Sequence, residues 1–106
     1  MSCDTGKSSH SVEALDKKYV LETAPNWDKE NLLMVYDGIA MLKQGTHPVG
    51  PMLSHLQNAE PGKHVVLKTD FPPAPLIKRL IDEGNEGFLV LPVEEGEPFQ
   101  SWFRKR

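Results

Sequence analysis

Short clusters of apolar residues recur along the chain and predict four strands. Residues 31–36 (NLLMVY) form an apolar run that ends at a turn, and such a run is typical of a buried strand. Residues 64–69 (HVVLKT) and 87–93 (GFLVLPV) have the same character. In residues 99–104 apolar and polar side chains alternate with a period of two, which predicts a strand with one buried face.

Two segments between these strands carry apolar residues at helical spacing. Each has a single apolar stripe, formed by Val49, Met52, Leu53 and Leu56 in the first segment and by Leu76, Ile77, Leu80 and Ile81 in the second. Pro75 suits the first turn of the second helix, because an N–H at that position has no partner within the helix. Residues 37–46, which precede the first helix, are expected to be a glycine-punctuated loop.

The resulting order is strand, helix, strand, helix, strand, strand. We therefore predict an α+β fold, a two-layer α/β sandwich in which two helices cover one face of a four-stranded mixed sheet. The predicted domain comprises residues 26–106, and residues 1–25 are predicted to be a flexible N-terminal tail. Within that tail, residues 12–24 favour a short amphipathic helix, with a short strand at 19–21 as the alternative.

The composition narrows the classes of function. A net charge of -3, from 12 basic and 15 acidic residues, argues against binding to nucleic acid, whose phosphates attract basic proteins. Cys3 is the only cysteine, so no disulfide can form within the chain, which fits a reducing compartment. The sequence has neither the apolar run of ~20 residues that a membrane helix needs nor an apolar leader. We therefore expect a cytoplasmic protein without a membrane partner.

The starts of both predicted helices are expected to meet at one rim of the sheet. Right-handed crossovers place each helix start at the carboxyl end of the preceding strand, which is the usual ligand side of such sheets. The candidate residues for binding a ligand or a partner at this rim are Asp37, His47, Pro48, Asp70 and Pro73. His47 is also the candidate metal ligand, because imidazole nitrogens bind metal ions. No catalytic residue is predicted, and no cofactor other than such a metal ion.

Several of these residues form a pattern that resembles a known family. Asp37, Met41-Leu42, Gly45 and His47-Pro48 are followed by Pro61-Gly62 and by FPPAPL at residues 71–76. The pattern covers residues 32–104 and resembles the TusA/SirA-like sulfur-carrier superfamily, most closely a branch that lacks the cysteine and has no assigned function. In the sulfur carriers a Cys-Pro pair opens the first helix, and its cysteine takes up a persulfide. Here His47 stands in place of that cysteine, so the resemblance implies the fold and the position of the site without the sulfur-carrying thiol.

Three functions are compatible with these features. The first is a non-enzymatic binding or accessory module that uses the rim to bind a protein partner or a small ligand. The second is a metal or redox accessory protein with His47 as a ligand, and the third is a sulfur-relay protein with a degenerate motif that uses Cys3. We expect a monomer or a weak dimer, the latter if the last strand, with Trp102, lies at an edge of the sheet. His64 begins its strand and is expected at the end of the sheet opposite the rim.

Overall fold

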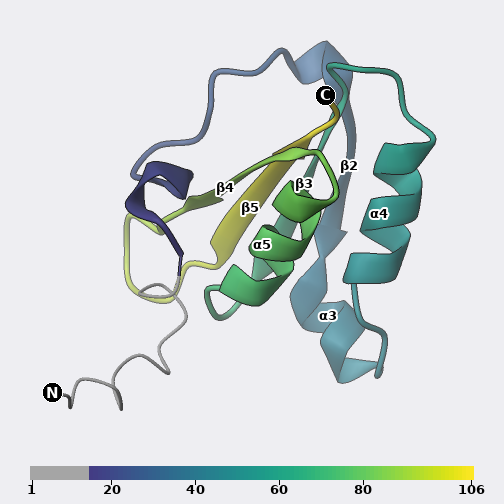
Figure 1. Ribbon diagram of the computed structural model, residues 1–106. Coiled ribbons are helices and arrows are strands. Elements are labelled where there is room, and N and C mark those ends of the chain that lie inside the picture. Colours follow the sequence, from purple (N-terminus) through teal and green to yellow (C-terminus); the bar gives the residue numbers. More distant parts are fainter. Residues whose placement is uncertain (1–14) are drawn as a thin grey trace, which may run out of the picture.

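A computed structural model describes residues 15–106 of the chain (Figure 1). Cys3 and the first residues of the predicted tail helix lie outside this described part. The strands are β1 (Val20–Leu21), β2 (Leu32–Asp37), β3 (His64–Thr69), β4 (Glu86–Val90) and β5 (Phe99–Arg104). The α-helices are α3 (Gly38–Lys43), α4 (Val49–Gln57) and α5 (Ala74–Asp82), and the 3-10 turns η1 (Lys17–Tyr19) and η2 (Lys29–Asn31) precede β1 and β2.

The five strands form one mixed sheet in the order β1-β4-β5-β3-β2. β1 is parallel to β4 and β2 is parallel to β3, whereas β5 is antiparallel to both β3 and β4. The helices α4 and α5 lie on the same face of this sheet (Figure 1). The predicted α+β fold is therefore confirmed, although the predicted number of strands was too low by one. The additional strand, β1, has two residues, too few for a period in the sequence to reveal it.

Part of the segment predicted to be a tail packs on the sheet. Leu15 is 4% exposed and belongs to the hydrophobic core. Val20 and Leu21 pair with residues 89 and 90 of β4, so the strand alternative at this position agrees with the structure. Within the described residues, the helix favoured for 12–24 is limited to the single 3-10 turn η1.

The segment after β2 is a helix and not the expected loop. Asp37 ends β2 and caps α3, because its side chain accepts a hydrogen bond from the backbone N–H of Ala40 (3.1 Å). Gly38 follows where the chain passes close to β3, since a Cβ there would lie 2.7 Å from the carbonyl oxygen of Lys68. A helix of six residues is too short to show a clear apolar stripe, which is why the sequence pattern does not reveal α3.

The core lies between the sheet and the two longer helices. Alternate residues of the central strands point into it, among them Val65 and Leu67 of β3 and Phe103 of β5. The predicted stripes of α4 and α5 supply the opposite side, where Met52, Leu53, Leu56, Leu76, Ile77 and Leu80 are buried. Each fully buried leucine or isoleucine side chain stabilises the fold by roughly 1.5–3 kcal/mol relative to an exposed one.

The last strand, β5, lies in the middle of the sheet between β3 and β4 and not at an edge, the position that would let it pair with a second copy. Trp102 is half-buried and has Val66 and Phe88 as its cross-strand neighbours. The edges of the sheet are β1 and β2. β3 and β4 follow one another along the chain, with only α5 between them, but they are not neighbours in the sheet. β5 lies between them and pairs with both.

An aromatic cluster covers part of the sheet face opposite the helices. Trp27 lies edge-on to His64, with ring centroids 5.2 Å apart, and edge-on to Trp102 at 5.8 Å. The rings of His64 and Trp102 stack with an interplanar angle of 13°. The Arg104 guanidinium lies 4.5 Å from the Trp27 ring and donates two hydrogen bonds, of 2.8 and 2.9 Å, to the Glu86 carboxylate. His64, at the start of β3, is only 1% exposed as a result.

The burial of His64 makes the fold sensitive to pH. Its Nδ1 has no hydrogen-bond partner among residues 15–106. Burial, and then the positive charge of Arg104, lower the pKa of His64 below its ordinary value of 6.5, whereas Asp28 acts in the opposite direction. The unfolded chain therefore binds a proton that the folded chain excludes. The contribution of the neutral His64 side chain to the free energy of unfolding is complete above about pH 6.5. It is lost as the pH falls from there through the lowered pKa of His64 in the folded chain.

Alanine substitution of two glycines tests the close approach of α3 to β3. Gly38→Ala is expected to lower the free energy of unfolding by about 2 kcal/mol, because the new Cβ meets the backbone of β3. Gly50→Ala, whose Cβ has no neighbour within 4 Å, is expected to raise it by about 0.5–1 kcal/mol, as is usual within a helix. Urea unfolding followed by circular dichroism measures both. Equal effects of the two substitutions would contradict the packing described for α3.

Substitution of His64 tests the pH dependence. The wild-type protein is expected to lose stability as the pH falls below about 6.5, and His64→Phe and His64→Gln should each lose less, because neither side chain binds a proton. Urea unfolding at a series of pH values gives the slopes. His47→Gln removes an exposed histidine and keeps His64, and it serves as the control with the wild-type slope. A wild-type slope in both His64 variants would show that this residue does not carry the effect.

Candidate functional site

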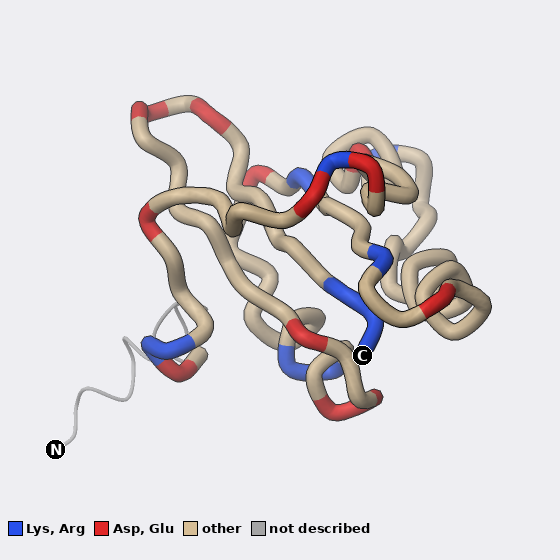
Figure 2. Tube along the Cα trace, turned by 90° about the horizontal axis from the view of Figure 1, so that it is seen from above, with Lys and Arg blue, Asp and Glu red and all other residues tan. Residues whose placement is uncertain are grey.

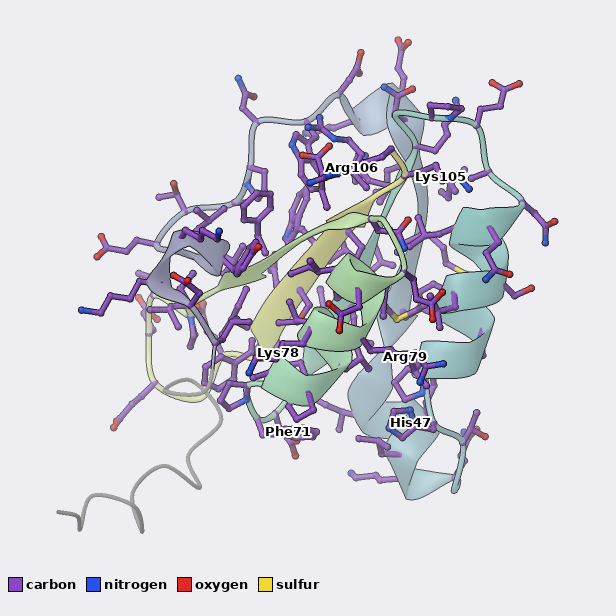
Figure 3. All side chains as sticks on the ribbon, viewed as in Figure 1. His47, Phe71, Lys78, Arg79, Lys105 and Arg106 are labelled. Carbon is purple, nitrogen blue, oxygen red and sulfur yellow. The ribbon has the colours of Figure 1, made fainter. Side chains whose placement is uncertain are left out.

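Three of the five candidate residues meet at one end of the molecule. His47 and Pro48 come from the connection between α3 and α4, and Pro73 from the connection between β3 and α5. They belong to a pocket of about 150 Å³, named here the entrance pocket, whose lining is Leu42, His47, Pro48, Thr69, Phe71, Pro73, Pro75 and Leu76. Figure 3 shows His47 and Phe71 at the same end of α4 and α5. The two connections share a rim because they follow β2 and β3, which are parallel neighbours.

Asp37 and Asp70 do not line the entrance pocket. The Asp37 carboxylate caps α3 through its hydrogen bond with the Ala40 amide. Asp70 is exposed and lines a different hollow, of about 390 Å³, beside the acidic connection between β4 and β5. Figure 2 shows the acidic residues of that connection away from the basic C-terminal end of β5. The rim is thus divided into an apolar part around His47 and an acidic part around Asp70.

The ring of His47 is held by the start of α4. Its Nδ1 accepts a hydrogen bond from the backbone N–H of Val49 (3.2 Å), one of the N–H groups that the first turn of a helix leaves free. Pro48 is the N-cap residue, and its buried side chain makes no capping hydrogen bond. With Nδ1 as the acceptor, the neutral imidazole carries its hydrogen on Nε2. His47 therefore keeps one donor, on an exposed ring at the border of the pocket.

A buried threonine shapes the opposite wall of the entrance pocket. Thr69 is 1% exposed, and its hydroxyl donates a hydrogen bond to the carbonyl oxygen of Phe71 (2.6 Å). The bond fixes the turn after β3, and the Phe71 side chain projects from this turn with 43% of its surface exposed. Pro73 caps α5 and Pro75 lies in its first turn. Because each proline ring fixes its own φ, this wall is held in one backbone conformation.

The lining of the entrance pocket contains no Asp, Glu, Lys or Arg. Leu42 and Phe71, which are 38% and 43% exposed, are among the few large apolar side chains on the surface of residues 15–106. Removing such surface from water is favourable by about 25 cal/mol per Å². Within the same residues, no group of three or more His, Cys, Asp or Glu side chains is arranged to hold a metal ion. The geometry suits a non-covalent contact with an apolar group, together with one hydrogen bond from His47.

Five residues of this pocket are not among the predicted site residues, namely Leu42, Thr69, Phe71, Pro75 and Leu76. Leu42 and Phe71 belong to the pattern that carries the family resemblance, but the pattern assigns them no role. Thr69 is the last residue of a buried strand and looks like any other strand residue. Phe71 belongs to a proline-rich segment, and an aromatic residue beside prolines is the one signal that points to it. His55 of α4 lies elsewhere, where its Nδ1 is 2.9 Å from the hydroxyl of Tyr36. Burial raises the pKa of that Tyr36 hydroxyl.

Comparison of the chain with protein-family models, with curated proteins and with solved structures finds no match. In the part of the chain that the structure describes, no helix is both long and apolar enough to cross a membrane. The geometry and chemistry of the entrance pocket are therefore the basis on which a function is proposed.

Thr69→Val tests the hydrogen bond that shapes the pocket wall. Valine keeps the shape of the side chain but leaves the carbonyl oxygen of Phe71 without its donor, so the free energy of unfolding should fall by about 1–2 kcal/mol. Thr46→Val, at an exposed position before α4, should change it by less than about 0.5 kcal/mol. Urea unfolding measures both variants. Equal stabilities would show that the Thr69 hydroxyl does not hold the turn.

Proposed function

We propose that this protein is a non-enzymatic binding module that takes one apolar side chain of a partner protein into the entrance pocket. The observation that carries the proposal is an apolar hollow between two helix starts, with Leu42 and Phe71 exposed beside it. Exposed apolar groups around a hollow commonly mark an interaction site, where a buried anchor supplies most of the binding energy. The lining offers no pair of groups for acid–base or nucleophilic chemistry, which favours recognition over catalysis.

The size of the entrance pocket favours a single side chain over a whole metabolite. Its volume of about 150 Å³ is smaller than the ~300–1,000 Å³ of typical small-molecule sites. A cavity of ~150 Å³ accepts a group the size of benzene. A phenylalanine or leucine side chain has this size and apolar character, so these residues are the proposed anchors.

His47 gives the contact its direction. Its Nδ1 is engaged with Val49, and its Nε2–H is free to donate to a backbone carbonyl next to the partner's anchor residue. One such hydrogen bond contributes about 0.5–1.5 kcal/mol net, less than the burial of a large apolar side chain. His47 thus orients the partner segment, while the apolar wall provides the affinity.

We also propose that the chain is related to the TusA/SirA-like superfamily. The order β2-α4-β3-α5-β4-β5, with His47-Pro48 before the first long helix, supports it. Sulfur relay would depend on Cys3, outside the described residues, because His47 has no thiol. A metal-based function lacks support within residues 15–106, where no three candidate ligands gather. Binding without covalent chemistry is therefore the function that the described site favours.

N-acetyl-phenylalanine amide is a suitable probe, because it presents one apolar side chain between backbone-like groups. Titrated into isotope-labelled protein, it should shift the amide NMR signals of Leu42, Thr69 and Phe71, with a Kd in the ~1 mM range. Phe71→Ser should weaken binding about five-fold through lost apolar contact. Val93→Ser is the matched control, because Val93 is an apolar residue that is 85% exposed on a different loop.

N-acetyl-glycine amide, which lacks a side chain, reveals any contribution from the backbone groups of the probe alone. The proposed function is contradicted if the phenylalanine probe shifts no signal of the entrance pocket. It is also contradicted if Phe71→Ser binds that probe as tightly as the Val93→Ser control does.

A further inference from the structure

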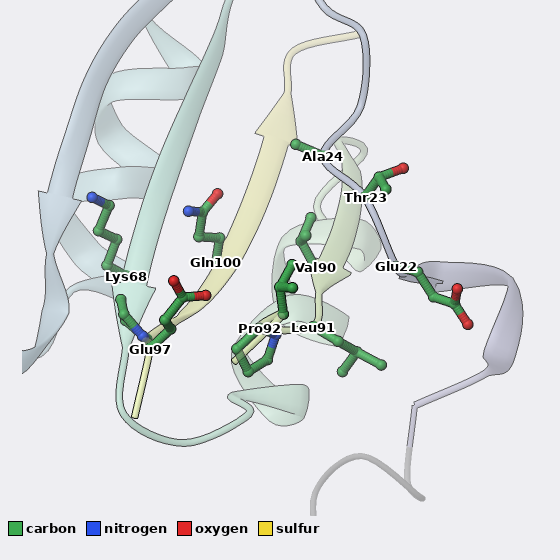
Figure 4. A pocket seen from close by; sticks show the side chains of 11 residues that line it. Glu22, Thr23, Ala24, Lys68, Val90, Leu91, Pro92, Glu97 and Gln100 are labelled. Carbon is green, nitrogen blue, oxygen red and sulfur yellow. The ribbon is translucent and has the colours of Figure 1, made fainter. Parts of the chain in front are cut away.

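A third hollow, named here the sheet-face cleft, lies on the face of the sheet opposite α4 and α5. Its volume is about 480 Å³, within the range of small-molecule sites, and it shares no lining residue with the entrance pocket. Its floor consists of Lys68 from β3, Gln100 from β5 and Val90 from β4. Residues 22–24, after β1, and parts of residues 91–98, between β4 and β5, form its walls (Figure 4).

Cross-strand register fixes the floor of the cleft. Gln100 pairs with Lys68 on one side and with Val90 on the other, so the three side chains form one row across the sheet. Ser101, the next residue of β5, is buried under the helices, and because side chains alternate along a strand the row faces the other way. The Trp102 Nε1–H donates a hydrogen bond to the Gln100 Oε1 (3.0 Å). This bond orients the Gln100 amide and leaves its NH₂ group for a ligand.

The sheet-face cleft is lined by one cation, Lys68, and by two carboxylates, Glu22 and Glu97. Figure 4 shows the Glu22 side chain directed away from Lys68 and Gln100. Lys68 makes no salt bridge within residues 15–106. Figure 4 shows Glu97 on the same side of the cleft as Lys68 and Gln100. One carboxylate oxygen of Glu97 accepts a hydrogen bond from the backbone N–H of Glu94 (3.4 Å), which leaves the other oxygen for a ligand. A cation, an amide donor and a carboxylate thus gather at one side of the cleft.

One wall of the cleft is apolar. Val90 and Pro92 lie across from Lys68 and Gln100 (Figure 4). Val90 is buried and Leu91 is half-buried, and Leu91 also donates its backbone N–H to the carbonyl oxygen of Leu21 (2.9 Å). This wall is therefore held by the extension of the β1–β4 pairing, and Pro92 restricts its backbone further. Such a surface complements an aliphatic group.

We propose that the sheet-face cleft binds a free α-amino acid with an aliphatic side chain. The Lys68 ammonium and the Gln100 NH₂ hold the α-carboxylate, and Glu97 holds the α-ammonium. The aliphatic side chain lies against Val90 and Pro92. A zwitterion pairs both Lys68 and Glu97 and covers the apolar wall, whereas a ligand with one charge pairs only one of these two side chains.

L-leucine is the probe for this site, compared with 4-methylpentanoate, which lacks the ammonium, and 3-methylbutylamine, which lacks the carboxylate. L-leucine should shift the amide NMR signals of Lys68, Val90 and Gln100 and the indole signal of Trp102. Each analogue should bind at least about ten-fold more weakly, because one charge-assisted contact is lost and its protein partner is left unpaired.

Two variants and a control identify the groups involved. Lys68→Met and Glu97→Gln replace exposed side chains by neutral ones of similar length, and each should weaken L-leucine binding at least about five-fold. Lys78→Met, which removes an exposed lysine from α5 on the other face of the sheet, should leave it unchanged. An unperturbed signal of the core residue Phe103 confirms that each variant is folded.

The absence of shifts in the cleft signals at ~20 mM L-leucine overturns this proposal, since even weak metabolite sites are occupied there. Equal binding of either analogue also overturns it, because one charge would then suffice. Wild-type affinity in Lys68→Met or Glu97→Gln does the same. Shifts of Leu42 and Phe71 report separately on binding of the leucine side chain at the entrance pocket, which shares no lining residue with the cleft. Lys68→Met and Glu97→Gln should weaken the shifts of Val90 and Gln100 and leave those of Leu42 and Phe71 unchanged, so the two proposals fail independently.

Discussion

The pairing of β5 with two strands at once is the constraint on which the fold depends. The other strands form two parallel pairs, β1 with β4 and β2 with β3, and only β5 joins these pairs into one sheet. Its side chains serve both faces, because Phe103 is fully buried under the helices while Gln100 and Trp102 line the opposite face. The entrance pocket depends on one parallel pair, and the sheet-face cleft extends across β5 to both pairs. The same central strand forms part of the floor of the cleft and joins the β2–β3 pair, which positions the entrance pocket, to the rest of the sheet.

Local patterns in the sequence predict most elements of this fold. The stripe from Val49 to Leu56 and the alternation in residues 99–104 both reflect periods that repeat within one element. The features that the sequence does not show are either very short elements or contacts between residues far apart in the chain. The helix α3 and the strand β1 contain too few residues for a period, and the place of β5 in the sheet depends on pairing with distant strands. The burial of His64 likewise arises from Trp27, which reaches it through tertiary packing alone.

The five candidate residues of the rim divide in a similar way. His47, Pro48 and Pro73 meet as predicted, because neighbouring parallel strands bring their following connections to one rim. Asp37 and Asp70 follow the same strands, but a short polar side chain is readily used within its own turn or left in solvent. The order of residues therefore predicts which connections share a rim of the sheet. It does not predict which side chains face the hollow, because that depends on the exact path of each connection.

The central position of β5 also sets the order of events while the chain is being synthesised. β2 and β3 can pair once residue 69 has emerged, and β4 can pair with β1 once residue 90 has emerged. The two halves then wait for residues 99–104, which must insert between them and cannot simply add to an outer edge. Pairs such as Val66 with Trp102 close long loops, which slows folding. During that interval the growing chain exposes the edges of β3 and β4, and these edges are the surfaces that a chaperone would have to protect.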